Sequence, residues 1–134
     1  MRGSCLCGSV EYEVEPPVKT FQYCHCSRCR KFTGSAHSAY IFASPAQFRW
    51  LRGAEQVSTY ELPDSKYLTT AFCRQCGSAV PAAIKGGKNI LVPAGTLDES
   101  PDILPQANIY WGSRAPWCSE TADLPKHDEL PPRK

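Results

Sequence analysis

Long apolar stretches are missing from this sequence of 134 residues. No run approaches the roughly 20 consecutive apolar residues that a membrane-spanning helix needs, so we expect no membrane partner. The N-terminal residues also lack the apolar segment of a secretory signal, which leads us to expect a cytoplasmic protein. In that reducing compartment, cysteines that lie close together in sequence are more often metal ligands than disulfides.

A strong charge of either sign is missing as well. The 15 Lys and Arg residues against 13 Asp and Glu residues give a formal net charge of +2. The basic residues are scattered rather than gathered in a stripe, so the sequence offers no evident surface for nucleic acid. Composition predicts no particular oligomeric state.

Long helical patterns are scarce, since 12 Pro and 9 Gly favour short elements and many turns. In the segment 9–15, Val10, Tyr12 and Val14 alternate with glutamates, which predicts a half-buried strand. Further short strands are expected at 36–43, 48–51, 57–62, 67–72, 79–84, 89–92 and 107–111. A hairpin turn is expected at 85–88, where two glycines accept positive φ. Helical turns are expected only just after Cys26 and around 44–48, each with a serine as cap. The fold class predicted is therefore all-β.

Seven of the eight cysteines fall into three tight groups. The groups are Cys5 and Cys7; Cys24, Cys26 and Cys29; and Cys73 and Cys76. Thiolates two or three residues apart converge on one small cation more easily than they close unstrained disulfides. Tetrahedral zinc takes four ligands, so seven thiolates divide into one complete site and one with a vacant position.

The two outer pairs predict a closed structural site. Cys73-Arg74-Gln75-Cys76-Gly77 is typical of a zinc knuckle, because the glycine lets the chain turn so that both thiolates face one centre. Cys5 and Cys7 need a partner pair to fill a tetrahedron, and joining the pairs ties the N-terminus to the middle of the chain. In small peptides such a zinc site contributes about 10–16 kcal/mol to folding.

The middle group leaves two interpretations open. Three ligands within residues 24–29 leave one side of a metal free, but His25, His37 or Cys118 could supply a fourth ligand and close the site. His25 lies between two ligands, so we expect its side chain to point elsewhere. An open zinc with three thiolates is suited to holding an incoming thiol as thiolate, and the matching chemistry is formation or cleavage of a carbon–sulfur bond. An iron–sulfur cluster fits the spacing less well.

The chain resembles the glutathione-dependent formaldehyde-activating enzyme family, which includes centromere protein V-like proteins and has an Mss4-like fold. The matching stretches are Gly3-Ser4-Cys5-Leu6-Cys7-Gly8, Cys24-His25-Cys26-Ser27-Arg28-Cys29-Arg30-Lys31 with Gly34-Ser35, Phe72-Cys73-Arg74-Gln75-Cys76-Gly77-Ser78, Ala94-Gly95-Thr96-Leu97-Asp98 and Ser113-Arg114-Ala115-Pro116-Trp117.

The resemblance implies short twisted antiparallel sheets with zinc knuckles. It also implies two zinc ions per chain, a structural one at Cys5, Cys7, Cys73 and Cys76 and a catalytic one at Cys24, Cys26 and Cys29. The implied activity is a carbon–sulfur lyase that joins a small, glutathione-like thiol to an aldehyde such as formaldehyde. We expect one such domain over residues 1–118 and a polar, Pro-rich tail over 119–134.

Two features qualify the resemblance. Family members often carry a histidine where this chain has Asn108, and an amide cannot shuttle a proton as imidazole does. Basic residues in or beside the motifs could bind the carboxylates of glutathione or remain solvated charges; they are Arg28, Arg30, Lys31, Arg74 and Arg114. The alternative function is a non-catalytic Mss4-like module with two structural zinc ions that binds a protein partner.

Overall fold

The computed structural model describes residues 1–118 and 124–132, and it is built almost entirely from short strands. The strands are β1 (Arg2–Ser4), β2 (Glu11–Val14), β3 (Thr20–Cys24), β4 (Ser38–Ala43), β5 (Phe48–Arg52), β6 (Val57–Glu61), β7 (Thr69–Cys73), β8 (Ala82–Ala83), β9 (Ile90–Pro93) and β10 (Ala107–Ile109). The helical elements are α1 (Ser27–Thr33) and the 3₁₀ turns η1 (Pro45–Gln47), η2 (Ala54–Gln56), η3 (Ala94–Thr96) and η4 (Trp111–Ser113). The predicted all-β class is confirmed. None of the described helices is long and apolar enough to cross a membrane.

The strands form three small sheets, ordered β1-β2-β5, β10-β3-β4-β9-β8 and β6-β7. All the pairs between these strands are antiparallel except that of β10 with β3, which is parallel. The antiparallel expectation is therefore wrong at this one edge. β10 lies far along the chain from β3, so no hairpin fixes its direction. It pairs Asn108 with Tyr23 and Ile109 with Cys24, which brings the end of β10 beside the middle cysteine group.

The main hydrophobic core lies between the first two sheets. Its fully or nearly buried members are Tyr12, Val14, Phe21, Ile41, Ala43, Ile90 and Val92. The alternation predicted for β2 is confirmed, since Val10, Tyr12 and Val14 are each 0% exposed. The Tyr12 hydroxyl lies 2.8 Å from the Thr96 hydroxyl, so its polar end is satisfied inside the core.

Three local predictions can be compared directly with the structure. The hairpin at 85–88 is confirmed: β8 and β9 are antiparallel, and Gly86 and Gly87 have φ of 87° and 68°. The helix after Cys26 also forms, but its cap is Cys26 and not a serine. The Cys26 sulfur accepts the Cys29 N–H at 3.5 Å, so a predicted metal ligand also starts the helix. Ser44 caps η1 as expected, with Gln47 completing a capping box.

The predicted strands differ most from the structure where pairing with a neighbouring strand defines the element. β1 and β3 were not expected, and the strand expected over 79–84 is reduced to Ala82–Ala83. Of the expected tail over 119–134, residues 119–123 and 133–134 lie outside the described part of the chain. Leu124 and Leu130 are exposed, and the domain boundary at residue 118 stays a prediction.

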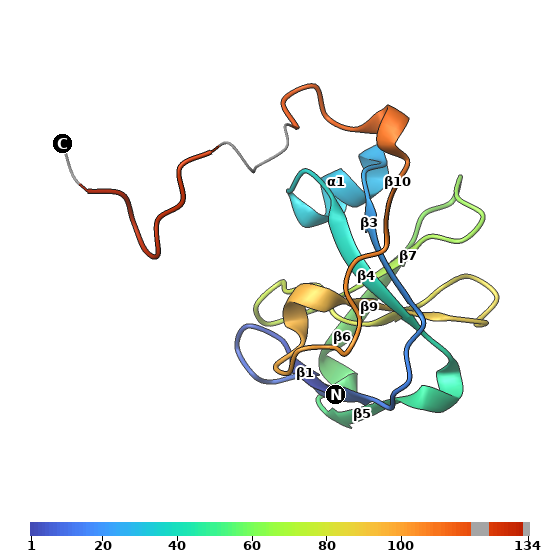
Figure 1. Ribbon diagram of the computed structural model, residues 1–134. Helices are drawn as coiled ribbons and strands as arrows, with labels where there is room; N and C mark the ends of the chain where they lie inside the picture. Colours follow the sequence, from blue (N-terminus) through green and yellow to red (C-terminus); the bar gives the residue numbers. More distant parts are fainter. Residues whose placement is uncertain (119–123, 133–134) are drawn as a thin grey trace.

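The molecule has two distinct ends (Figure 1). The N-terminus lies at one end with β1 and β5, whereas α1 and the end of β10 lie together at the other. The five-stranded sheet runs between them, because β3 leads up to α1 and β4 returns from it. The middle cysteine group, which spans the end of β3 and the start of α1, therefore lies at the α1 end.

Gly53 gives a test of how closely the β2 and β5 segments pack. Its φ is +75°, and a Cβ atom placed on it would lie 1.9 Å from the Ser9 carbonyl oxygen. Replacing Gly53 by alanine should lower the free energy of unfolding by about 3 kcal/mol, from backbone strain together with overpacking. Gly87→Ala is the matched control, because Gly87 has φ of +68° and open space around it; its loss should be only about 1 kcal/mol. Urea unfolding at one fixed zinc concentration measures both variants, and equal losses would contradict the packing argument.

Candidate metal centre

The four outer cysteines come together in one cluster. Cys5 and Cys7 lie in the β1–β2 loop, Cys73 ends β7 and Cys76 follows it in a tight turn. All four sulfur atoms lie within 4.8 Å of one another. Sulfur–sulfur distances of 3.5 Å for Cys5–Cys7 and 3.9 Å for Cys7–Cys73 bracket the roughly 3.8 Å expected for tetrahedral zinc with Zn–S bonds of about 2.3 Å.

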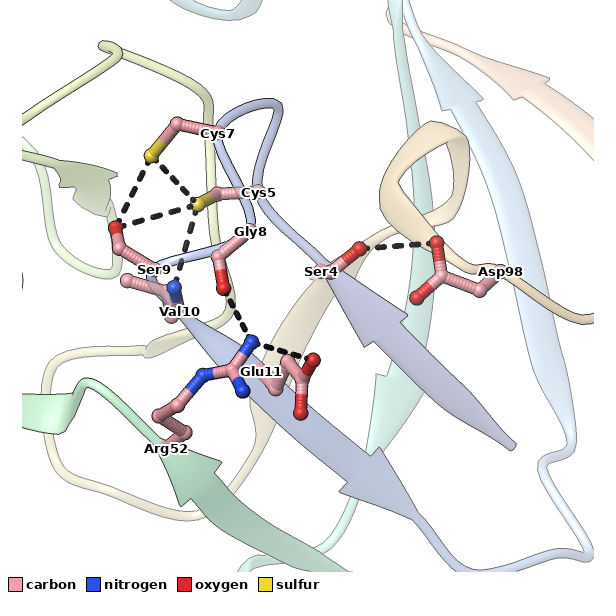
Figure 2. A network of polar contacts seen from close by, with 9 residues as sticks. All are labelled: Ser4, Cys5, Cys7, Gly8, Ser9, Val10, Glu11, Arg52 and Asp98. Carbon is pink, nitrogen blue, oxygen red and sulfur yellow. Dashed lines mark hydrogen bonds and ion pairs between the residues drawn. The ribbon is translucent and has the colours of Figure 1, made fainter.

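Backbone and hydroxyl groups support the β1–β2 loop in this arrangement (Figure 2). The Ser9 hydroxyl lies 3.1 Å from the Cys7 sulfur, and the Val10 N–H donates to the Cys5 sulfur at 3.3 Å. The Arg52 guanidinium donates to the Gly8 carbonyl oxygen at 2.6 Å and to the Glu11 carboxylate at 2.7 Å. Supporting hydrogen bonds of this kind orient thiolate ligands around a metal.

The middle cysteines form a second, smaller cluster. Cys24 ends β3, Cys26 caps α1 and Cys29 lies on its first turn. Their three sulfur atoms also lie within 4.8 Å of one another. Cys24 and Cys29 are buried, and Cys26 is half-buried. All eight cysteines of the chain are free thiols, so no disulfide competes for either cluster.

None of the three candidate fourth ligands joins the three-cysteine cluster in the described part of the chain. His37 stacks on the Tyr23 ring with centroids 4.3 Å apart. Cys118 is a half-buried free thiol outside both clusters. His25 packs edge-on against the Trp111 ring at 4.8 Å, and the expectation that it points elsewhere agrees with this contact.

Asn108 is the hydrogen-bond partner of His25. The His25 Nε2 atom lies 2.9 Å from the Asn108 Oδ1 atom. A carbonyl oxygen only accepts, so Nε2 carries the proton and donates. The ring is 2% exposed, and its Nδ1 atom is buried without a hydrogen-bond partner among the described residues. Asn108 therefore acts on the orientation of a residue that lies between two cluster cysteines.

In the smaller cluster, the contact between Cys24 and Cys29 shifts the pKa values of both thiols. A hydrogen bond with Cys29 lowers the pKa of the Cys24 thiol, and the same contact raises the pKa of Cys29. Ser38, which pairs with Cys24 across β3 and β4, has a buried hydroxyl near Cys29 that offsets part of the rise in the Cys29 pKa. Three thiolates around a cation are strong acceptors for such a donor, so this donor set fits zinc.

A cavity of about 550 Å³ opens beside the smaller cluster and has all three of its cysteines in the wall. Its other lining residues are Arg28, Phe42, Ser65, Lys66, Tyr67, Leu68, Ile84, Asn89, Leu91 and Tyr110. The volume falls in the range of small-molecule sites, and the mixture of apolar walls with a few polar groups is typical of them. Of the larger cluster, only Cys5 contributes to a described cavity, which has about 430 Å³.

Among the five basic residues considered from the sequence, Arg28 alone lines the 550 Å³ cavity. Arg114 lies over the Trp111 ring at 4.6 Å, and the guanidinium of Arg74 donates to the Glu55 carbonyl oxygen. Arg30 donates to the Ser113 carbonyl oxygen at 3.4 Å. Lys31 is exposed and is not among the residues that line the cavity.

Sequence reasoning missed several residues of the cavity wall, notably Lys66, Leu68 and Tyr110. They carry no motif, and they reach the cysteines only through the folding of the segment before β7 and of the end of β10. One signal for Tyr110 exists only in the backbone: its φ of 54° is the one positive value at a non-glycine position in the described residues. Such values are uncommon and are enriched at functional sites.

Comparisons with known proteins agree with this geometry. The chain is 33% identical over 84 residues to a "Putative glutathione-dependent formaldehyde-activating enzyme" of Halomonas elongata, covering 60% of this chain and 54% of that protein. It is 29% identical over 87 residues to an "Uncharacterized lyase" of Schizosaccharomyces pombe, covering 65% of this chain and 60% of that protein. The chain thus spans little more than half the length of these curated relatives.

A solved structure is similar over most of the fold. The crystal structure of a Rhodobacter sphaeroides protein superposes with a TM-score of 0.63 and 26% identity, covering 81% of this chain and 98% of that one. The family model described as "Glutathione-dependent formaldehyde-activating enzyme" matches residues 1–113, which include both cysteine clusters. The chain belongs to the glutathione-dependent formaldehyde-activating enzyme family.

Proposed function

We propose that this protein is a zinc-dependent carbon–sulfur lyase that joins a small, glutathione-like thiol to an aldehyde and reverses that reaction. Two zinc ions per chain are part of the proposal, a structural one at Cys5, Cys7, Cys73 and Cys76 and a catalytic one at Cys24, Cys26 and Cys29. The family and the printed names of the relatives support lyase chemistry with glutathione and formaldehyde. A thiol-rich centre of this kind needs a reducing compartment such as the cytoplasm.

The observation that carries the proposal is the position of the three-cysteine cluster in the wall of the 550 Å³ cavity. The other cluster has four sulfur atoms, which complete a tetrahedron and leave no position for a substrate. Three sulfur atoms leave one position, and the cavity gives a small molecule access to it. Structural zinc sites are closed, whereas catalytic ones keep an open position.

The cysteines, the apolar residues and the basic residues of the site have separate roles in the proposed reaction. Cys24, Cys26 and Cys29 would hold the zinc ion, which would bind the substrate thiol in its nucleophilic thiolate form. Phe42, Leu68 and Leu91 exclude water from the same volume. Arg28 and Lys66 provide positive charge for the carboxylates of a glutathione-like thiol.

Removing one ligand of the smaller cluster tests the proposal directly. Exchange between glutathione with formaldehyde and their S-hydroxymethyl adduct, followed by NMR exchange spectroscopy, should be accelerated by the protein. Cys24→Ser should lower that acceleration by more than about 100-fold, because losing a ligand costs more than losing one of its supporting groups. Cys118→Ser is the matched control and should retain full activity, because Cys118 lies outside both clusters. Absence of acceleration by the wild-type protein with any small thiol would instead favour a non-catalytic module that binds a protein partner.

A chelator titration tests the assignment of the two sites. Four thiolates hold zinc more firmly than three, so a chelator at equilibrium should remove the zinc of Cys24, Cys26 and Cys29 first. Circular dichroism should change little at that step, and loss of the second zinc should unfold the chain, since the larger cluster joins the N-terminal loop to β7. Metal content per chain measured beside the spectrum gives the order. Simultaneous loss of both ions, or unfolding with the first, would contradict the division of roles.

A further inference from the structure

If the three-cysteine cluster carries the lyase reaction proposed above, the walls of the adjoining cavity determine which aldehyde fits. Four apolar side chains, Phe42, Leu68, Leu91 and Ile84, line the cavity and are half-buried. The buried lining residue Ser65 has its hydroxyl engaged, because it accepts the Leu68 N–H at 3.0 Å. The wall that the cavity shares with Cys24 and Cys29 is thus mostly apolar.

A second, smaller cavity extends this apolar region. It has about 100 Å³ and shares Cys24, Cys29 and the same three apolar side chains with the larger one. Its remaining lining residues are Gln22, Tyr40 and Ile109. Tyr40 is buried.

The charged lining residues occupy the exposed part of the cavity. Arg28 and Lys66 are both exposed, and the Lys66 ammonium lies 5.2 Å from the Tyr67 ring centroid. Both charges are positive, and the described lining residues include no carboxylate. The opening therefore suits an anionic group, whereas the interior suits an apolar one.

Formaldehyde is too small to contact most of the apolar interior of the cavity. Its adduct adds one carbon with a hydroxyl group to the sulfur, and a one-carbon group cannot cover four apolar side chains. A thiol that carries carboxylates places them at Arg28 and Lys66, outside the apolar interior. The part of the adduct that enters the interior is then the substituent on the former carbonyl carbon.

We propose that the aldehyde used by this protein is an apolar one of several carbons, aliphatic or aromatic, combined with an anionic thiol. In the forward direction the thiol loses its proton, its sulfur forms a bond to the carbonyl carbon, and the carbonyl π electrons move to oxygen. That oxygen takes up a proton, and the product is a hemithioacetal. The reverse direction breaks the same carbon–sulfur bond, and neither direction involves oxidation or reduction.

A series of linear aldehydes tests the proposal with the zinc-loaded full-length protein and glutathione. Propanal, butanal, pentanal and hexanal are compared by NMR exchange, each rate divided by its uncatalysed rate at the same pH. A fully buried methylene should raise kcat/KM about 4-fold, so the gain from propanal to hexanal should exceed about 10-fold. Formaldehyde is measured beside them as the reference substrate of the proposed function.

The possible outcomes distinguish the proposal of an apolar aldehyde from the proposed lyase function on which it rests. Acceleration with formaldehyde but no rise, or a fall, with chain length would overturn the apolar aldehyde and leave the lyase function standing. No acceleration with any aldehyde would overturn both. A parallel series holds propanal constant and lengthens the thiol from 3-mercaptopropanoate to 6-mercaptohexanoate. If kcat/KM rises with chain length in the thiol series and not in the aldehyde series, the thiol fills the interior of the cavity. That outcome would also overturn the proposal.

A variant pair tests the wall itself. Leu68 lines both cavities, so Leu68→Trp should narrow the interior and lower the hexanal-to-propanal ratio of kcat/KM at least about 5-fold. Leu104→Trp is the matched control, because Leu104 is 81% exposed and lines neither cavity; its ratio should equal that of the wild type. The ratio compares two substrates in one sample, so partial loss of folded protein does not affect it. An unchanged ratio in Leu68→Trp would contradict the assignment of this wall.

Discussion

The convergence of sulfur atoms from distant parts of the chain is the constraint on which this structure depends. Among the described residues, the main core has seven buried members, and the two other clusters of buried side chains are built around cysteines. One contains Cys5 and Cys73 with Val10, Ala71, Val80 and Ala82, and the other contains Cys24, Cys29 and Tyr40. A domain with so small a core gains little from apolar burial alone, so a cation bound by these thiols would add folding free energy.

The two clusters differ in how they are assembled. The larger one needs the β1–β2 loop and the end of β7 to meet, which makes it a cross-link between sheets. The smaller one comes from residues 24–29 alone, at the junction of β3 and α1. A cluster made by one short segment does not have to close the fold. It can therefore keep a free side, and β10 and the segment before β7 build a cavity on that side.

Features of the fold that depend on local sequence patterns could be predicted from the sequence alone. Cysteine spacing specified both clusters, the alternation in residues 9–15 specified β2, and the paired glycines specified the β8–β9 turn. It was insufficient where distant segments decide the outcome. The parallel edge strand β10 and the cavity wall from Lys66 to Leu68 depend on which segments lie side by side. No local property of Leu68 distinguishes a cavity residue from any other strand-flanking leucine.

Tyr110 shows how such distant pairing can hold a strained residue at the site. A non-glycine residue in the left-handed region costs about 1–2 kcal/mol, yet Tyr110 keeps φ of 54° at the junction of β10 and η4. The residues before it are fixed by the parallel pairing of Ile109 with Cys24 and by the contact of Asn108 with His25. The Tyr110 carbonyl oxygen accepts the Ser113 N–H at 2.9 Å, which fixes the residues after it. Tyr110 is held from both sides, and it lines the same cavity as Cys24 and Cys26 while 65% of its surface stays exposed. Asn108 thus bears on the shape of the cavity, because its contact with His25 anchors the strand that leads to Tyr110.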